Sequence, residues 1–170
     1  MRRPIATMLS VLALASAAPA IAQQPSPSCR ISAYVIDQDA AGLNVRAGPS
    51  ARSRVLRVIA SQTSAVAEIR GQSGAWFRVS RIFNAEDDSN LFSGDGWVHS
   101  SLLGLSIAND DPRLYARPLR QSRVLARLVA DESQVTLIGC AGTWARVRAG
   151  GRTGWLSRGG QCSNPLTTCA

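Results

Sequence analysis

Few side chains in this sequence have the chemistry of a catalytic group. The 170 residues include one histidine, His99, and no lysine. This composition excludes a lysine-based phosphate loop, a Schiff-base lysine and a zinc site with two histidines. The stretch Gly71-Gln72-Ser73-Gly74 is one residue short of the Gly-x-Ser-x-Gly turn of serine hydrolases. We therefore predict a protein that is not an enzyme and has no cofactor and no metal site.

Four cysteines are the other reactive side chains: Cys29, Cys140, Cys162 and Cys169. Neither a Cys-x-x-Cys pair nor a Cys/His pair has the spacing of a zinc site, so disulfide bonds are the favoured interpretation. Four cysteines allow three pairings. Among these we favour Cys140 with Cys162, both in the second half of the chain, and Cys29 with Cys169, which would join its two ends.

The N-terminus has the three parts of a secretory signal peptide: Met1-Arg2-Arg3, an apolar run over residues 8–18, and Ala20-Ile21-Ala22. The apolar run is shorter than the about 20 residues that span a bilayer. We predict that residues 1–22 are cleaved, leaving an exported protein, periplasmic or secreted, without stable membrane insertion. A retained membrane anchor is the alternative. Residues 23–30 are predicted to be a polar linker.

The mature chain is basic, and all its basic residues are arginines. Removal of Arg2 and Arg3 leaves 19 − 2 = 17 arginines against 11 acidic residues, a net charge of +6. Such a protein would be attracted to anionic wall polymers or lipid headgroups. Solvated strand faces and the codon usage of a GC-rich genome are the favoured explanation of the arginine content. Nucleic acid is not expected as a partner, because export removes the protein from it.

Short alternating runs predict an all-β fold. Leu43 and Val45 alternate with Asn44 and Arg46, and Gly48-Pro49-Ser50 then ends the strand. Similar runs, separated by Gly, Asn, Asp and Ser, continue along the chain. The strands predicted in the first half are 31–37, 43–46, 55–59, 65–71, 76–82 and 96–99.

Together with two Gly/Trp landmarks, Gly74-Ala75-Trp76 and Gly96-Trp97-Val98, the stretch over residues 42–50 resembles the signature of the bacterial SH3-like (SH3b) domain. In that family a Leu-Asn-Val-Arg strand is followed by a Gly-Pro-Ser turn. The resemblance implies a small SH3-like β-barrel and a non-catalytic binding module. Its expected partner is cell-wall peptide or glycan (peptidoglycan) or a wall-associated protein. A scaffold or inhibitor that binds only another envelope protein is the alternative.

The same landmarks recur in the second half, which indicates a tandem repeat. Leu114-Tyr115-Ala116-Arg117 aligns with residues 43–46, and Gly/Trp pairs recur at Trp144 and Trp155. We predict SH3-like domain 1 at 31–106 and domain 2 at 110–170, joined by a short polar segment. In this alignment Tyr115 replaces the Asn of the signature, and the turn that follows is two residues shorter.

The apolar positions of these strands are the predicted core of the two small domains, to which the disulfides add stability. They are Leu43, Val45, Val55, Val58, Ile69, Val79 and Val98 in the first domain, and Leu114, Val124, Leu128, Val135, Leu137, Val147 and Leu156 in the second.

By resemblance, the strand face and turn of the signature form the candidate ligand site. The predicted residues are Asn44, Arg46, Gly48, Pro49, Trp97 and Tyr115. Among the aromatic residues Tyr115 is the ring expected to be most exposed, whereas the tryptophans are expected mainly to cover the ends of the barrels. The acidic stretch over residues 85–90 is either an elongated hairpin loop or a specificity loop of the same site. His99 is expected to face solvent at the end of a strand.

Overall fold

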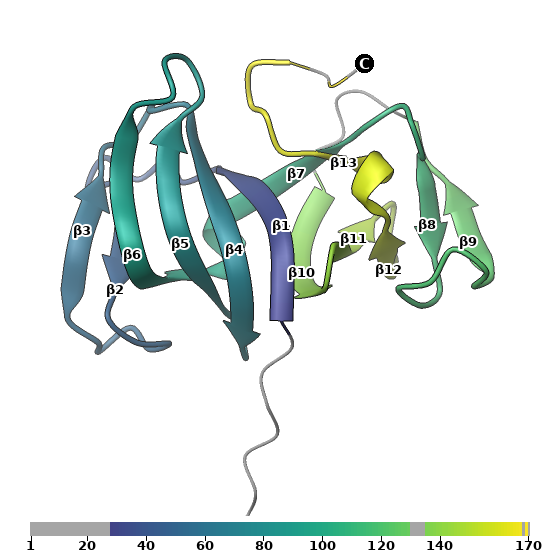
Figure 1. Ribbon diagram of the computed structural model, residues 1–170, viewed down its shortest axis with the longest axis horizontal. Helices are drawn as coiled ribbons and strands as arrows, with labels where there is room; N and C mark the ends of the chain where they lie inside the picture. Colours follow the sequence, from purple (N-terminus) through teal and green to yellow (C-terminus); the bar gives the residue numbers. More distant parts are fainter. Residues whose placement is uncertain (1–27, 130–134, 168, 170) are drawn as a thin grey trace, which may run out of the picture.

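The computed structural model describes residues 28–129, 135–167 and 169, which form strands and two short 3₁₀ helices (Figure 1). The predicted signal peptide, residues 1–22, lies outside the described residues. The strands are β1 (Ser28–Val35), β2 (Leu43–Arg46), β3 (Val55–Ile59), β4 (Ala65–Ser73), β5 (Trp76–Asn84), β6 (Asn90–His99), β7 (Leu103–Ile107), β8 (Arg113–Tyr115), β9 (Val124–Arg127), β10 (Val135–Ala141), β11 (Trp144–Ala149), β12 (Arg152–Leu156) and β13 (Gln161–Cys162). The predicted all-β fold is confirmed. Strand β1 begins at Ser28, so it includes three residues that the sequence assigned to a linker.

Hydrogen bonds join the strands into one continuous sheet. Its order is β3-β2-β6-β5-β4-β1-β7-β10-β11-β12-β8-β9, and β13 pairs with β7 off this path. Strands β1 and β7 lie in the middle, where Tyr34 pairs with Gly104 and Val35 with Leu103. Strands β2–β6 form one half of the molecule and β8–β12 the other (Figure 1).

The strand pairing of the first half recurs in the second. Strand β1 pairs with β4 and with β7, which follows the 3₁₀ helix η1 (Ser100–Leu102). Strand β7 pairs in turn with β10 and with β13, which follows η2 (Arg158–Gly160). Strand β7 is therefore the last strand of the first half and the first strand of the second. The sheet is continuous from one half to the other through β7, and the short polar segment that the sequence predicted as a joint lies at the end of this strand.

The hairpins β2–β3 and β8–β9 also share their backbone register. Ala47 N donates to Arg54 O, and Ala116 N donates to Arg123 O, both at 2.9 Å. Equivalent residues of the two hairpins are therefore 69 positions apart in the sequence (47 and 116, 54 and 123). The two turns therefore have the same length.

This register corrects the alignment made from the sequence, which was wrong by two residues at this hairpin. Tyr115 corresponds to Arg46 and not to Asn44, since Tyr115 lies opposite Trp155 as Arg46 lies opposite Trp97. The sequence alignment matched residue types, Leu and Arg, whereas the backbone pairs by position along the strand.

Ten of the predicted core positions are buried. The prediction was wrong for Val55, Val58 and Val124, whose exposed fractions are 38%, 48% and 42%, and Leu128 is only partly buried. The reason lies in the strand order: β3 and β9 are the two edges of the sheet. Each edge strand has a neighbour on one side only, so much of its apolar surface stays in solvent.

The disulfides join Cys29 to Cys140 and Cys162 to Cys169, so the predicted pairing was wrong. The start of β1 lies against the second half. There the backbone of Cys29 forms an isolated β-bridge with Gly142, in the turn between β10 and β11. This crossing places the Cα atoms of Cys29 and Cys140 5.6 Å apart. The chain then turns back after Cys162, which brings its Cα within 5.5 Å of that of Cys169.

Removal of the Cys29–Cys140 bond, by serine at both positions, is expected to cost more stability than the same change at Cys162 and Cys169. The first bond spans 111 residues of sequence and the second only 7. In the chain-entropy model such loops contribute about 5 and about 2–3 kcal/mol. Urea unfolding of the two double variants beside the oxidised parent measures the difference, and equal losses would contradict this explanation.

Candidate functional site

A shallow groove of about 250 Å³ lies beside β2 in the first half of the molecule. We call it the β2 groove. It is lined by Asn44, Arg46, Ala51, Trp76, His99 and Leu102.

Strand β2 provides two of the predicted site residues to this groove. Leu43 and Val45 are buried in the core, whereas Asn44 and Arg46 are half-buried on the other face, as the alternation predicts. Arg46 Nη1 donates to Ser53 O at 2.9 Å. This bond holds the guanidinium against the turn and leaves most of its five N–H donors for a ligand.

Three other predicted residues do not line the groove. Gly48 and Pro49 lie in the turn that follows β2, where a Cβ at Gly48 would stand 2.9 Å from Ser53 Oγ. A larger side chain at this position would require the Ser53 hydroxyl to move, and Pro49 is exposed beside it. Trp97 is half-buried on β6, opposite Arg46 in the strand pairing, and is absent from the lining of the groove.

Trp76 and His99 also line the groove, and the sequence analysis did not assign them to the ligand site. Their rings meet edge to face, with centroids 5.1 Å apart. His99 Nδ1 lies 2.7 Å from Ser101 Oγ and accepts from Ser101 N at the start of η1, which leaves Nε2 for a ligand. The Gly-Ala-Trp landmark marked Trp76, but only the pairing of β5, β6 and β2 brings these rings beside Arg46.

The acidic loop between β5 and β6 lies away from the groove. Trp76 begins β5 and the loop follows the ninth residue of that strand, a separation of roughly 25 Å along the strand. The loop and the β2–β3 turn lie at opposite ends of the first half (Figure 1). Arg81 pairs with Asp88 at 2.8 Å, and Ser64 donates to Glu86 at 2.9 Å. The loop is thus an elongated hairpin turn whose acidic side chains are held by Arg81 of β5 and by Ser64, which precedes β4.

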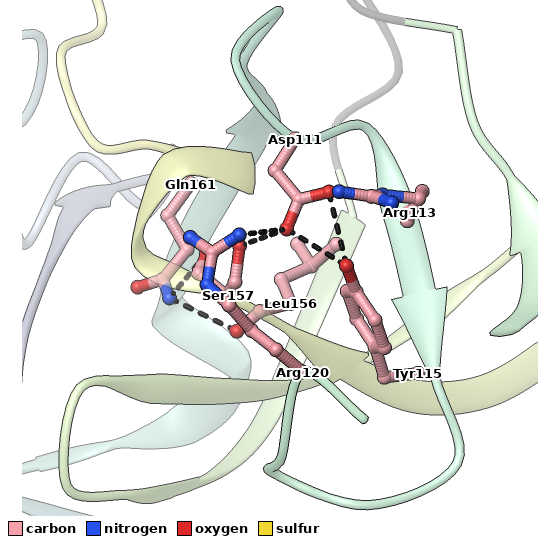
Figure 2. Close-up of polar contacts among 7 residues, drawn as sticks. All are labelled: Asp111, Arg113, Tyr115, Arg120, Leu156, Ser157 and Gln161. Atoms are coloured by element: carbon pink, nitrogen blue, oxygen red, sulfur yellow. Dashed lines mark hydrogen bonds and ion pairs between the residues drawn. The ribbon is translucent and has the colours of Figure 1, made fainter. Parts of the chain in front are cut away.

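In the second half a buried carboxylate, that of Asp111, lies at the centre of a polar cluster (Figure 2). Arg113 Nε and Ser157 Oγ each donate to it at 2.5 Å. Tyr115 Oη donates at 3.1 and 3.2 Å, and Arg120 Nη1 lies 3.5 Å away. Only 2% of Asp111 is exposed.

The residues that hold Asp111 stand at the positions that line the β2 groove in the first half. In the shared register Asn44 corresponds to Arg113, Arg46 to Tyr115 and Ala51 to Arg120. His99 corresponds to Ser157, because each lies two residues after the paired tryptophan, Trp97 or Trp155. The second groove is therefore filled by a carboxylate of the protein itself, whereas the first is open.

Tyr115 is consequently not the exposed ring that the sequence predicted. It is 1% exposed and packs edge to face on Trp144, with centroids 5.4 Å apart. Burial raises the pKa of Tyr115, and its hydrogen bond to Asp111 raises it further. The sequence prediction failed because it placed Tyr115 two positions out of register and could not foresee its partner.

Two further features bear on the chemistry of the chain. Over the ranges that the structure describes, no group of three or more His, Cys, Asp or Glu residues is placed to hold a metal ion. In the same ranges, no helix is long and apolar enough to cross a membrane.

Comparison with known protein families gives a match on the half that contains the open groove. Residues 41–104 match the family model of the bacterial SH3 domain. This SH3 segment runs from just before β2 into the start of β7 and includes every residue that lines the β2 groove. No curated protein matches the chain.

The Asp111→Asn variant is expected to lose about 2–3 kcal/mol at neutral pH, since charge-assisted hydrogen bonds to a buried group are lost. Burial raises the pKa of Asp111, but hydrogen bonds from Ser157, Arg113 and Tyr115 and the charge of Arg113 outweigh it and hold the pKa below 3.8. The ionised carboxylate therefore contributes its full stability above the unfolded-state pKa, about 3.9. This contribution is lost as the pH falls through the lower folded-state pKa.

Urea unfolding of the parent and of Asp111→Asn from neutral pH down to below pH about 3 tests this expectation. The difference in unfolding free energy between the parent and Asp111→Asn should stay the same around neutral pH and become smaller as the pH falls into the acid range. Asp110→Asn, at the exposed neighbouring residue, is the matched control and should change stability little. A difference that stays the same at every pH would show that the carboxylate charge is not what stabilises the cluster.

Proposed function

We propose that this protein is a non-catalytic binding module of the bacterial cell envelope and that its ligand binds in the β2 groove. The open, cationic and aromatic groove within the SH3 segment carries this proposal. A guanidinium such as that of Arg46 pairs bidentately with a carboxylate, and the face of an aromatic ring packs on a sugar or a peptide. Cell-wall peptide, with its free carboxylates, is the ligand that fits this combination best, and wall glycan is the other component of the same polymer.

The filled groove of the second half supports a carboxylate ligand. There, the residues equivalent to the groove wall surround the side chain of Asp111. We propose that the second half, residues 110–170, is a second SH3-like copy that has lost ligand binding. The first copy, residues 31–106, would then bind alone.

We also propose that the protein is exported, after cleavage at Ala22, and acts in the periplasm or outside the cell. Two disulfide bonds support an oxidising compartment. Nucleic acid is not a partner in this proposal.

A scaffold or inhibitor that binds another envelope protein is the second candidate. Edge strand β3 favours it, because Val55 and Val58 are exposed there. The unpaired backbone groups of an edge strand accept an extended segment of a partner, which adds as a further strand.

Co-sedimentation of the mature, oxidised protein with purified peptidoglycan sacculi tests the wall hypothesis. The parent is expected to remain bound at physiological salt, because a fitted groove is screened less than exposed charges are. Arg46→Ala and Asn44→Ala are expected to reduce retention about tenfold or more, since each removes hydrogen bonds to the ligand.

Arg117→Ala, at an exposed arginine in the second hairpin, is the control with the same change of charge and should remain bound. Retention that disappears with salt in every variant would reduce the interaction to general attraction between a basic protein and an anionic polymer. Absence of retention at low and physiological salt would exclude the wall polymer and favour the protein partner.

A further inference from the structure

A second cavity, of about 650 Å³, lies where the two halves of the molecule meet. Three arginines from three different elements line it: Arg30 of β1, Arg70 of β4 and Arg158 of η2. We call it the arginine pocket. The remaining lining residues are Ile31, Ser32, Glu68, Thr143, Gln161 and Ser163.

Positive charge exceeds negative charge in the arginine pocket. Glu68 is its one carboxylate, and it is already engaged, in a close ion pair with Arg70 and at 3.8 Å from Arg81. Arg30 and Arg158 have no carboxylate partner in the part of the chain that the structure describes. Two guanidiniums therefore reach the pocket without a counter-charge.

The strand pairing places like charges together at this point. The register of β1 against β4 shifts between Ser28 and Ile31, opposite Gly71 and Ile69, so Arg30 and Arg70 lie in the same irregular stretch of the pairing and both line the pocket. Arg70 is paired with Glu68. The charge that a bound anion would neutralise at this point is therefore that of Arg30.

Neutral donors complete the lining. The hydroxyls of Ser32, Thr143 and Ser163 make no hydrogen bond within the described ranges and can donate to an oxyanion. The amide of Gln161 is held in place instead, since its Nε2 donates to the carbonyls of Thr143, Leu156 and Ser157 at 2.9–3.1 Å (Figure 2 shows the last two of these).

Covalent bonds hold the walls of the arginine pocket in position. Arg30 follows Cys29, which is bonded to Cys140 of the second half, and Arg30 N donates to Gly142 O at 2.6 Å. On the other side, Ser163 follows Cys162 of the second disulfide. The two disulfides thus fix the backbone on two sides of the pocket, which lowers the cost of ordering it around a ligand.

We propose that the arginine pocket binds a phosphate monoester. Its two uncompensated guanidiniums match the charge of about −1.5 to −2 that such a group carries at neutral pH, whereas a single carboxylate supplies only half of it. The pocket has room for more than a phosphate group, and the ligand in this proposal is a larger polar molecule that carries the phosphate, either a free phosphorylated sugar or alcohol or the headgroup of a lipid. This site is separate from the β2 groove and does not depend on the function proposed for it.

Isothermal titration of the mature, oxidised protein with glycerol 3-phosphate, at physiological salt, tests the site. The same titration with a mixture of glycerol and acetate, which supplies a singly charged carboxylate in place of the phosphate, tests whether the higher charge of the phosphate is required. Arg30→Gln combined with Arg158→Gln is expected to weaken binding at least about tenfold, since each charged hydrogen bond contributes more than 1.4 kcal/mol. Arg123→Gln combined with Arg148→Gln, at exposed arginines outside the pocket, is the control with the same loss of charge and should bind like the parent.

Flotation with phosphatidylcholine vesicles, with and without phosphatidic acid, distinguishes the two sources of the phosphate. Binding of glycerol 3-phosphate identifies a free ligand, and binding only to the vesicles with phosphatidic acid identifies a headgroup. Equal loss of binding in the two double variants would overturn the site, as would equal affinity for acetate or no binding in either assay. Arg46→Ala should bind glycerol 3-phosphate like the parent, because Arg46 lies outside the arginine pocket. The sacculus assay therefore tests the wall hypothesis and the phosphate assays test this site, and either one can fail without the other.

Discussion

The pairing of β1 with β7 is the constraint on which the rest of the molecule depends. Each half has about the size at which a single hydrophobic core is only marginally stabilising. Strand β7 completes the sheet of the first half beside β1 and begins the sheet of the second beside β10. The Cys29–Cys140 bond then fastens the start of β1 to the second half. The second half therefore lacks a complete set of strands unless β7, which also closes the first half, is present.

On this shared scaffold the two halves treat the same position differently. In the first half, small or polar residues such as Asn44 and Ala51 leave the β2 groove open. In the second, Asp111 enters the equivalent space and satisfies the arginines and the tyrosine that line it. A buried carboxylate is tolerated there because every one of its neighbours donates to it. The cluster is thus a structural element at the positions that line the candidate groove in the first half.

The arginines fall into two groups, according to whether the protein itself supplies a partner for the guanidinium. Some have structural partners within the protein, as Arg46 has in Ser53, Arg81 in Asp88 and Arg113 in Asp111. Others, such as Arg30 and Arg158, reach a cavity and have no carboxylate partner among the residues that the structure describes. A net charge read from composition does not separate these two groups. Their distinction depends on which strands the fold brings together.

The sequence by itself determined the all-β class, most strands of the first half and the outward face of β2, because a period of two is a local property of the chain. It also located Asn44 and Arg46 at the candidate site. It did not predict β7, the strand shared by the two halves. The tertiary structure alone decided the disulfide pairing, the exposure of Val55 on an edge strand and the burial of Tyr115. Each of these depends on which strands become neighbours and in which register. Such neighbours are set by contacts between residues far apart in the sequence, and no local pattern records them.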